Sequence, residues 1–293
     1  MKASAINHRF VAIDEGLGTL LCVDERDPGR GWCVPIGHPE PRDLQLAGGH
    51  RILVGHHHGF TEFDLTGGAV VRTVGAFAGV TSVRRQRDGT TLVAGVNLAG
   101  RDGVAVLTLD PSNRIMSRAT YPGDYVRLVR QTAAGTYLMC CNDRIREGSP
   151  QGGYLREFRA DGFYHAWKAV RLPDGRLLVS AGYGAFLAEF SPAGVLVRRF
   201  GGKNEVPAEV NPFFYAMHQL LPDGHTVVAN WQGHGPGHGG SGVPLLQFDP
   251  AGRLVWTWNE PERISSLQGV LVLDDLDTAL LHDERFGTMQ PVR

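Results

Sequence analysis

A repeated turn-and-strand element is the feature that most restricts the fold of this 293-residue chain. A Leu-Pro-Asp-Gly turn leads into an apolar strand at 172–179 and again at 221–228, and weaker copies occur at 48–54, 87–93 and 134–139. Each copy is followed by a second alternating strand that ends in another turn. Each copy therefore predicts a β-hairpin.

The period of this repeat indicates the architecture. The second strands begin about 40 to 50 residues apart, which suits a four-stranded propeller blade and exceeds the period of leucine-rich or ankyrin repeats. The 39 glycines and 17 prolines are spread along the chain, as many short turns between many short strands require. We predict an all-β fold, with residues 1–293 forming one β-propeller domain.

The two ends of the chain indicate how the ring closes. Three strand-like segments at 10–14, 19–24 and 31–36 lack an innermost partner, and the segment 265–273 has the composition to supply it. Pairing the N- and C-terminal strands would remove an exposed sheet edge. This predicts six blades, and a further strand-like stretch at 278–282 leaves seven blades as the alternative.

Charge and composition restrict partners and location. With 29 basic and 30 acidic residues the net charge is -1, which predicts no attraction to nucleic acid or to anionic membranes. The N-terminus lacks the apolar segment of a secretion signal, and no stretch approaches the roughly 20 apolar residues of a membrane span. The four cysteines lack the paired spacing of a structural zinc site. We expect a cytoplasmic protein that binds a small molecule; the sequence indicates no oligomeric state.

In a propeller, functional groups converge where innermost strands and neighbouring loops surround one mouth of the channel. The residues at corresponding strand ends form a polar, histidine-rich set: Asp14, Glu15, His56, His57, His58, Asn97, Cys141, Asn142, Tyr183, Asn230 and Trp231. Innermost strands and their starts add Arg42, Arg127, His165, Lys168, His218 and Gln268. This mouth is therefore the predicted functional site.

Histidines in this set suggest a metal site. Because side chains alternate along a strand, His56 and His58 should share one face. Imidazole is a common ligand of zinc, iron and copper, and a ring of blades can gather ligands that are distant in sequence. We predict a divalent metal (Zn, Fe or Cu) held by His56, His58, His165 and His218, with His282 as a further ligand if the last segment turns inward. The alternative is that these histidines hydrogen-bond strand ends and loops and hold no metal.

The same set supplies predicted catalytic and binding residues. His218, His165 and Tyr183 are predicted to exchange protons with a substrate. The predicted substrate-binding residues are Trp231, Asn230, Asn142, Lys168, Arg127 and Gln268. For Lys168 there is an alternative, in which it reaches solvent or pairs with a carboxylate. The glycine-rich loop 233–242 is either a lid over the ligand or a connection between blades.

Several segments resemble a known group of proteins. Asn230-Trp231-Gln232-Gly233-His234-Gly235, with 245–249, 255–258 and 264–268, resembles bacterial propellers with PQQ-like repeats. The segment 218–224, which starts at His218, is more remotely similar to a repeated pattern of arylsulfotransferase propellers. The first resemblance covers most of the chain and implies the propeller fold, but it does not imply bound PQQ. The second implies group transfer with His218 as the candidate residue.

These observations predict a small-molecule enzyme whose active site is the histidine-rich channel mouth. A metal-dependent lyase, hydrolase or isomerase fits the predicted residues. The alternatives are a noncatalytic propeller that binds a ligand or a protein, and an arylsulfotransferase-like group transfer. Polar groups gathered at the strand ends favour the enzyme, because a scaffold has no need of them.

Overall fold

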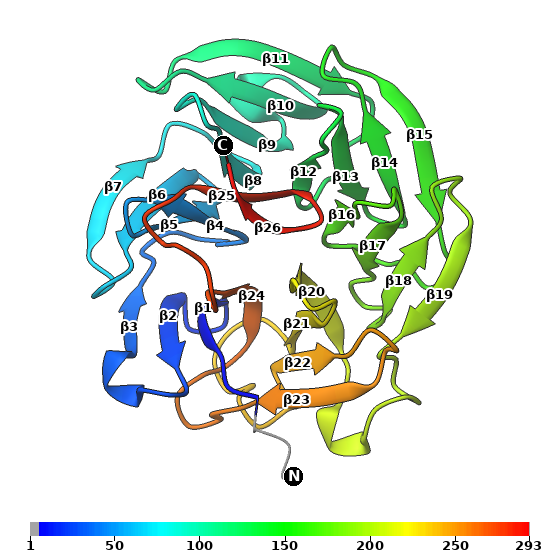
Figure 1. The fold of residues 1–293 in the computed structure, drawn as a ribbon. Helices are drawn as coiled ribbons and strands as arrows, with labels where there is room; N and C mark the ends of the chain where they lie inside the picture. The colour runs from blue at the N-terminus through cyan, green and yellow to red at the C-terminus, as the bar shows by residue number, and fades with distance from the viewer. Residues whose placement is uncertain (1–5, 293) are drawn as a thin grey trace.

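The computed structural model describes residues 6–292. Six blades of four strands each stand around a central channel, which confirms the predicted propeller, and two C-terminal strands extend the sheet of the sixth blade (Figure 1). No helix in the described part of the chain is long and apolar enough to cross a membrane.

Each blade has its innermost strand at the channel and its fourth strand at the rim. Blade 1 consists of β24 (Leu267–Val272), β1 (Arg9–Asp14), β2 (Thr19–Asp24) and β3 (Trp32–Pro35). Blade 2 consists of β4 (Asp43–Gly48), β5 (Arg51–His56), β6 (Gly59–Asp64) and β7 (Val70–Val74). Blade 3 consists of β8 (Val80–Arg85), β9 (Thr91–Val96), β10 (Val104–Leu109) and β11 (Ile115–Tyr121).

The other three blades repeat this order. Blade 4 consists of β12 (Val129–Gln131), β13 (Tyr137–Cys141), β14 (Arg144–Gly148) and β15 (Tyr154–Arg159). Blade 5 consists of β16 (Ala169–Arg171), β17 (Leu177–Ser180), β18 (Leu187–Phe190) and β19 (Leu196–Phe200). Blade 6 consists of β20 (Phe214–Leu220), β21 (Thr226–Trp231), β22 (Leu245–Phe248) and β23 (Leu254–Trp258).

The Leu-Pro-Asp-Gly segments form the predicted turns between first and second strands. In blade 5, the backbone N–H of Leu172 donates to the Arg176 carbonyl at 2.8 Å, and that of Gly175 donates to the Leu172 carbonyl at 2.9 Å. The Asp174 carboxylate accepts a bond from the Arg176 N–H at 3.1 Å. Gly175 has φ of 84°, which glycine adopts without strain. The repeated tetrapeptide therefore marks the start of each second strand.

The ring closes as the two ends of the chain predict. Strand β24 pairs antiparallel with β1, from Phe10 opposite Val272 to Asp14 opposite Leu267. The buried Asp14 carboxylate accepts bonds from the backbone N–H groups of Ser265 and Ser266, at 2.7 and 3.0 Å. The C-terminal part of the chain thus supplies the innermost strand of the first blade.

A buried histidine fastens this closure. His8 is only 5% exposed, and its ring bonds the Asp274 carboxylate at 2.5 Å and the Gln247 side chain at 2.6 Å. Burial alone would lower the pKa of His8, but bonding to Asp274 and Gln247 and the negative charge of Asp274 outweigh burial, so the pKa is raised above 6.5. Protonated His8 is therefore favoured in the folded state.

We expect the bonds of His8 to Asp274 and Gln247 to make the free energy of unfolding pH-dependent. A raised folded-state pKa contributes stability that is fully present below the unfolded value of 6.5 and is lost as pH rises through the folded value. Urea unfolding of wild type and His8→Gln at about pH 5.5 and about pH 9 measures it. Relative to wild type, the variant should lose more stability at the lower pH. An equal loss at both pH values would contradict a stabilising role of protonated His8.

A C-terminal hairpin crosses one end of the channel. It consists of β25 (His282–Phe286) and β26 (Thr288–Pro291) and lies over the centre of the ring in Figure 1. The segment that leads into it and the hairpin itself contact the carboxyl ends of innermost strands: Ala47 of β4 bridges Leu281, and Leu220 of β20 pairs with Thr288. The Gln45 side chain also donates to the His282 carbonyl at 3.0 Å. The stretch 278–282 is thus no seventh blade, because it leads into this hairpin.

Buried ion pairs attach the hairpin to the channel wall. Glu284 accepts bonds from Lys168 at 2.5 Å, from Arg84 at 2.7 Å and from Arg130. Arg130 also bonds Asp43 at 2.7 Å. All five side chains are at least 94% buried. These three cations and two carboxylates come from four different blades and the hairpin.

Candidate functional site

The channel mouth opposite the hairpin is where the innermost strands begin. The hairpin contacts the carboxyl ends of these strands, so the residues that precede them lie around the other mouth. Arg42 stands directly before β4, and Arg127 and Trp167 each stand one residue further from the start of β12 and β16. Lys168, between Trp167 and β16, extends its side chain the other way, to Glu284 of the hairpin. Second strands run antiparallel to the first, so their last residues reach the same mouth.

Arg127 has no acidic partner at this mouth. Its guanidinium carbon lies 4.5 Å from the ring centroid of Tyr125 and 5.5 Å from that of Trp167. No ion pair reaches it from any described carboxylate, and its buried Nε has no hydrogen-bond partner. Arg127 therefore presents a positive charge between two aromatic rings without a carboxylate in direct contact, although Glu40 attracts it from a longer distance.

A second arginine lies beside it. Arg42 bonds the Glu40 carboxylate at 2.8 Å. Burial lowers the pKa of Arg42 to about 10, and the nearby positive charge of Arg127 adds to this. Burial would raise the pKa of Glu40, but the charges of Arg42 and His57 hold it below its usual value. Glu40 is therefore ionised and already contacts both Arg42 and the His57 ring.

An aromatic wall surrounds the arginines. The His165 ring lies 5.0 Å from Tyr125 and 5.7 Å from Tyr183, measured between ring centroids. Tyr183 in turn packs edge-on against Phe214 at 4.7 Å and Trp231 at 6.3 Å. Tyr183 is 37% exposed, so part of the wall faces solvent. Flat apolar groups of a ligand can pack against such rings.

His165 is held at the mouth in an unusual backbone conformation. Its φ is 57°, in the left-handed region, and its N–H donates to the Asn142 side chain at 3.1 Å. Asn142 also accepts, through its carbonyl, a bond from the N–H of Ala166 at 2.9 Å. Strained backbone of this kind persists where surrounding bonds fix it, and it gathers at functional sites.

The electrostatic surroundings keep His165 neutral. Burial and the positive charge of Arg127 lower the pKa of His165 below 6.5. Its ring contacts aromatic neighbours, and neither ring nitrogen has a hydrogen bond within the described structure. A neutral imidazole with a free nitrogen is suited to accept a proton from a substrate.

Buried polar atoms without protein partners are numerous along the channel, from the mouth to the ion pairs beneath it. Six of the eleven such side-chain atoms in the described residues are Tyr125 Oη, Arg127 Nε, Trp167 Nε1, Gln268 Oε1 and both ring nitrogens of His218. Each unsatisfied atom costs about 1–3 kcal/mol. Native proteins keep such groups where they meet water or a ligand. The concentration distinguishes the channel from the rest of the fold.

The structure brings part of the predicted site together. His165, Tyr183, Arg127 and Trp231 meet at the mouth, and Asn142 positions His165. His218 and Gln268 lie on innermost strands, buried in the channel. Arg42 was predicted at this mouth by its position but without a specific role, and Tyr125 and Trp167 were not predicted. The signal that could have found these two is their place in the segments that lead into β12 and β16.

Two predicted binding residues have structural roles instead. Lys168 is 1% exposed and pairs with Glu284, which confirms the carboxylate alternative and leaves no amine for a substrate. Burial lowers the pKa of Lys168 to about 8, against the attraction of Glu284. The Asn230 amide bonds backbone groups of Phe213 and Val243, at 2.9 and 3.0 Å. Both side chains are therefore engaged within the protein.

The predicted histidine metal site does not form. No three His, Cys, Asp or Glu side chains among residues 6–292 are placed to hold a metal. His56 turns inward and stacks on His38 at 4.0 Å, and burial and neighbouring histidines lower its pKa to about 3. His282 lies in the hairpin, where its ring bonds the Leu280 carbonyl. The alternative, that histidines bond strand ends and loops, fits His282 and also His58, whose N–H donates to His56.

The glycine-rich loop 233–242 is attached to blade 1. Glu15 accepts bonds from Trp231 Nε1 at 3.0 Å and from His234 Nδ1 at 2.8 Å. The Ser265 hydroxyl donates to the Gly235 carbonyl at 2.8 Å. In this conformation the loop connects blades and fixes the Trp231 ring at the mouth.

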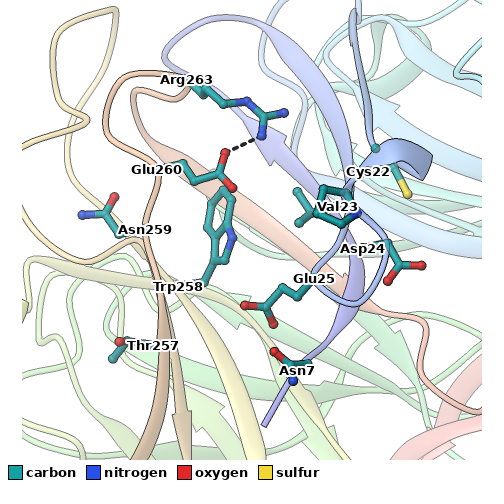
Figure 2. A pocket seen from close by; sticks show the side chains of 12 residues that line it. Asn7, Cys22, Val23, Asp24, Glu25, Thr257, Trp258, Asn259, Glu260 and Arg263 are labelled. Carbon is teal, nitrogen blue, oxygen red and sulfur yellow. Dashed lines mark hydrogen bonds and ion pairs between the residues drawn. The ribbon is translucent and has the colours of Figure 1, made fainter. Parts of the chain in front are cut away.

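A separate groove lies between blades 1 and 6, with a volume of about 410 Å³ (Figure 2). Its carboxylates have protein partners: Glu25 accepts a bond from the His8 N–H at 2.7 Å, and Glu260 pairs with Arg263. No unpartnered buried side-chain atom of the described residues lines it. The groove therefore lacks the unsatisfied groups that mark the channel mouth.

Comparison with known proteins supports the fold. No family model matches this sequence, and no curated protein matches it. The structure is similar to a protein of unknown function from Bacteroides caccae, with a TM-score of 0.75 and 20% identity over 92% of this chain and 100% of that chain. At such identity the likeness shows the fold alone.

Two lyases share the propeller shape. A streptogramin B lyase has a TM-score of 0.57 and 10% identity, over 88% of this chain and 89% of its own. A catalytically inactive histidine-to-alanine variant of virginiamycin B lyase from Staphylococcus aureus, solved with quinupristin, has a TM-score of 0.55 and 9% identity, over 86% and 84%. These findings support a propeller and show no link to PQQ-like or arylsulfotransferase proteins.

Proposed function

We propose that this protein is a small-molecule enzyme whose active site is the channel mouth formed by Arg42, Arg127, Tyr125 and His165. The observation that carries the proposal is the neutral His165 imidazole, whose ring nitrogens are free and which lies beside an unpaired arginine. General-base catalysis needs this protonation state and free nitrogen. The reaction class that we favour is elimination, as in a lyase.

In this elimination His165 acts as the base and Tyr125 as the acid. His165 takes the proton from a carbon atom of the substrate, and the electron pair of the broken C–H bond forms a C=C bond. The bond to the leaving oxygen breaks, and the Tyr125 hydroxyl donates the proton that this oxygen needs. Burial raises the pKa of Tyr125, so the hydroxyl is protonated beforehand. Proton return from His165 to Tyr125 restores both groups.

Two further points support an acid–base enzyme over a binding propeller. The Asn142 side chain fixes the left-handed backbone at His165, which holds its imidazole next to Tyr125 and Tyr183 as a positioned base requires. Two propellers of similar shape are lyases, and one is inactivated by loss of a histidine. This likeness raises elimination above hydrolysis and isomerisation as the reaction class.

A turnover assay tests the proposal. The probes are β-hydroxy and β-acyloxy phenylpropanoates, whose elimination yields cinnamate and is followed by ultraviolet absorbance. Wild type and His50→Ala should form cinnamate and His165→Ala should not, because His50 is an exposed histidine at the hairpin end of the channel. Cinnamate from His165→Ala at the wild-type rate, or from no protein in the panel, would overturn the proposal, and the second result favours a noncatalytic propeller.

A further inference from the structure

We infer that the channel mouth binds an oxyanion, of the carboxylate, phosphate or sulfate class, between Arg42 and Arg127, with an attached planar ring against Tyr125 and Trp167. The inference rests on the proposed function, since it names the class of substrate for that site. It is argued from charge, from unsatisfied donors and from ring geometry.

The charges at the mouth leave one cation without a partner. The groups that face Arg127 are Arg42, Glu40, Tyr125 and His165. Glu40 is engaged by Arg42 at 2.8 Å and by His57 at 3.3 Å. Two further acids lie at this mouth: Glu15 accepts bonds from Trp231 and His234, and the buried Asp14 accepts bonds from the backbone N–H groups before β24. No described carboxylate therefore forms an ion pair with Arg127, and the attraction of Glu40 acts on it only from a longer distance, so a ligand anion could contact Arg127 directly.

Unsatisfied donors lie beside this cation. Trp167 is 2% exposed, and its Nε1 has no hydrogen-bond acceptor. Tyr125 Oη and Arg127 Nε are also buried without partners. All three groups can donate a hydrogen bond, and an oxyanion accepts several at once. The Arg127 guanidinium carbon lies 4.5 Å from the Tyr125 ring centroid and 5.5 Å from that of Trp167, so the three groups form one cluster.

The channel beneath the mouth adds a positive field. Its buried charges are the cations Arg84, Arg130 and Lys168 and the anions Asp43 and Glu284. His218 lies among them, and burial holds its pKa well below 6.5, so it adds no charge. Three cations face two anions, and clefts with an excess of one sign attract ligands of the other.

The ring geometry identifies the rest of the ligand. Arg127 already lies over Tyr125 and Trp167, and the wall continues through His165 to Tyr183. A planar ring next to the oxyanion can pack on these faces. A cationic ligand would also favour aromatic faces, but here it would meet Arg42 and Arg127 at close range. The mouth therefore discriminates against amines.

Isothermal titration calorimetry with small probes tests the inference. The anions are benzoate, phenyl phosphate and phenyl sulfate, which also distinguish the three anion sources, and the comparisons are neutral benzamide and cationic benzylammonium. At least one anion should bind about tenfold or more tightly than benzamide, and benzylammonium should bind weakest. Benzamide or benzylammonium binding as tightly as every anion, or no binding by any anion, would overturn the inference.

Variants locate the binding. Arg127→Met should weaken binding of the best anion by about tenfold to a hundredfold and leave benzamide unchanged. The matched control is Arg199→Met, which removes an arginine stacked on Phe186 at 4.8 Å on the outside of blade 5. Arg127→Lys keeps the charge and should retain part of the affinity, and thermal unfolding verifies that each variant is folded. Unchanged anion affinity in folded Arg127→Met overturns the inference.

The two proposals fail separately. Anion binding that depends on Arg127 without any turnover would overturn the enzyme proposal and leave the oxyanion site standing. Turnover that depends on His165, together with equal affinity for benzoate and benzamide, would do the reverse.

Discussion

Replacing Glu284 by alanine is expected to lower the free energy of unfolding by about 3–5 kcal/mol, because removal of one member of a buried ion pair leaves its partners uncompensated. Here the partners are Lys168, Arg84 and Arg130, all buried with Glu284. Urea unfolding followed by tryptophan fluorescence measures the loss. The matched control is Glu260→Ala, which removes a half-exposed carboxylate paired with Arg263 and should cost about 1 kcal/mol or less.

The same variant should change the acid limb of the stability profile. The three cations hold the pKa of Glu284 well below its usual value of 4.5, against the effect of burial. A lowered pKa contributes stability that is present above the unfolded value and is lost as pH falls through the folded value. Wild type should therefore lose stability below about pH 4.5 more steeply than Glu284→Gln. An alanine variant as stable as wild type would show that the hairpin is not anchored by this residue.

For the probe that wild type converts, His165→Ala is expected to lower kcat by about 10²–10⁴-fold, the usual contribution of a positioned general base. Asn142→Ala should lower kcat less, because Asn142 acts only by accepting a bond from the His165 N–H, at 3.1 Å. Initial rates of cinnamate formation measure both. His50→Ala is the control and should keep the wild-type rate, because His50 lies at the other end of the channel.

The pH profile gives a readout that a structural role would not move. Burial and Arg127 lower the pKa of His165, so the base is already deprotonated at neutral pH. The rate of wild type should be flat near neutral pH and fall in acid, below about pH 6.5, as the imidazole gains a proton. Arg127→Met removes one of the two causes and should shift this acid limb upward by a fraction of a pH unit. A limb that stays in place in both Arg127→Met and His165→Ala would contradict His165 as the base.

The fold was predictable because its signals are local and repeated. The turn at Leu172–Gly175 recurs with the same bonds at Leu221 and Gly224, so one observation fixes several blades. Ring closure by β24 was predictable because three N-terminal strands lacked an inner partner. The C-terminal hairpin was not predictable, because its position depends on Glu284 meeting cations from three separate blades.

The site was predictable only in part. Position at strand starts and ends selected Arg127, His165 and Tyr183, which the structure brings together at one mouth. The metal prediction failed because alternation holds only within a strand: β5 ends at His56, whereas His58 lies in the turn and donates its N–H to the His56 ring. Asn230 and Lys168 are engaged by backbone carbonyls and by Glu284, and no sequence pattern reveals such long-range partners.

A crystal structure of the protein with phenyl phosphate tests the central claim most directly, because it locates the ligand independently of any rate. We predict the phosphate between Arg42 and Arg127, with the phenyl ring against Tyr125 and Trp167 and within reach of His165. Phenyl phosphate bound only in the groove between blades 1 and 6, or elsewhere on the outside of the propeller, would contradict an active site at the channel mouth.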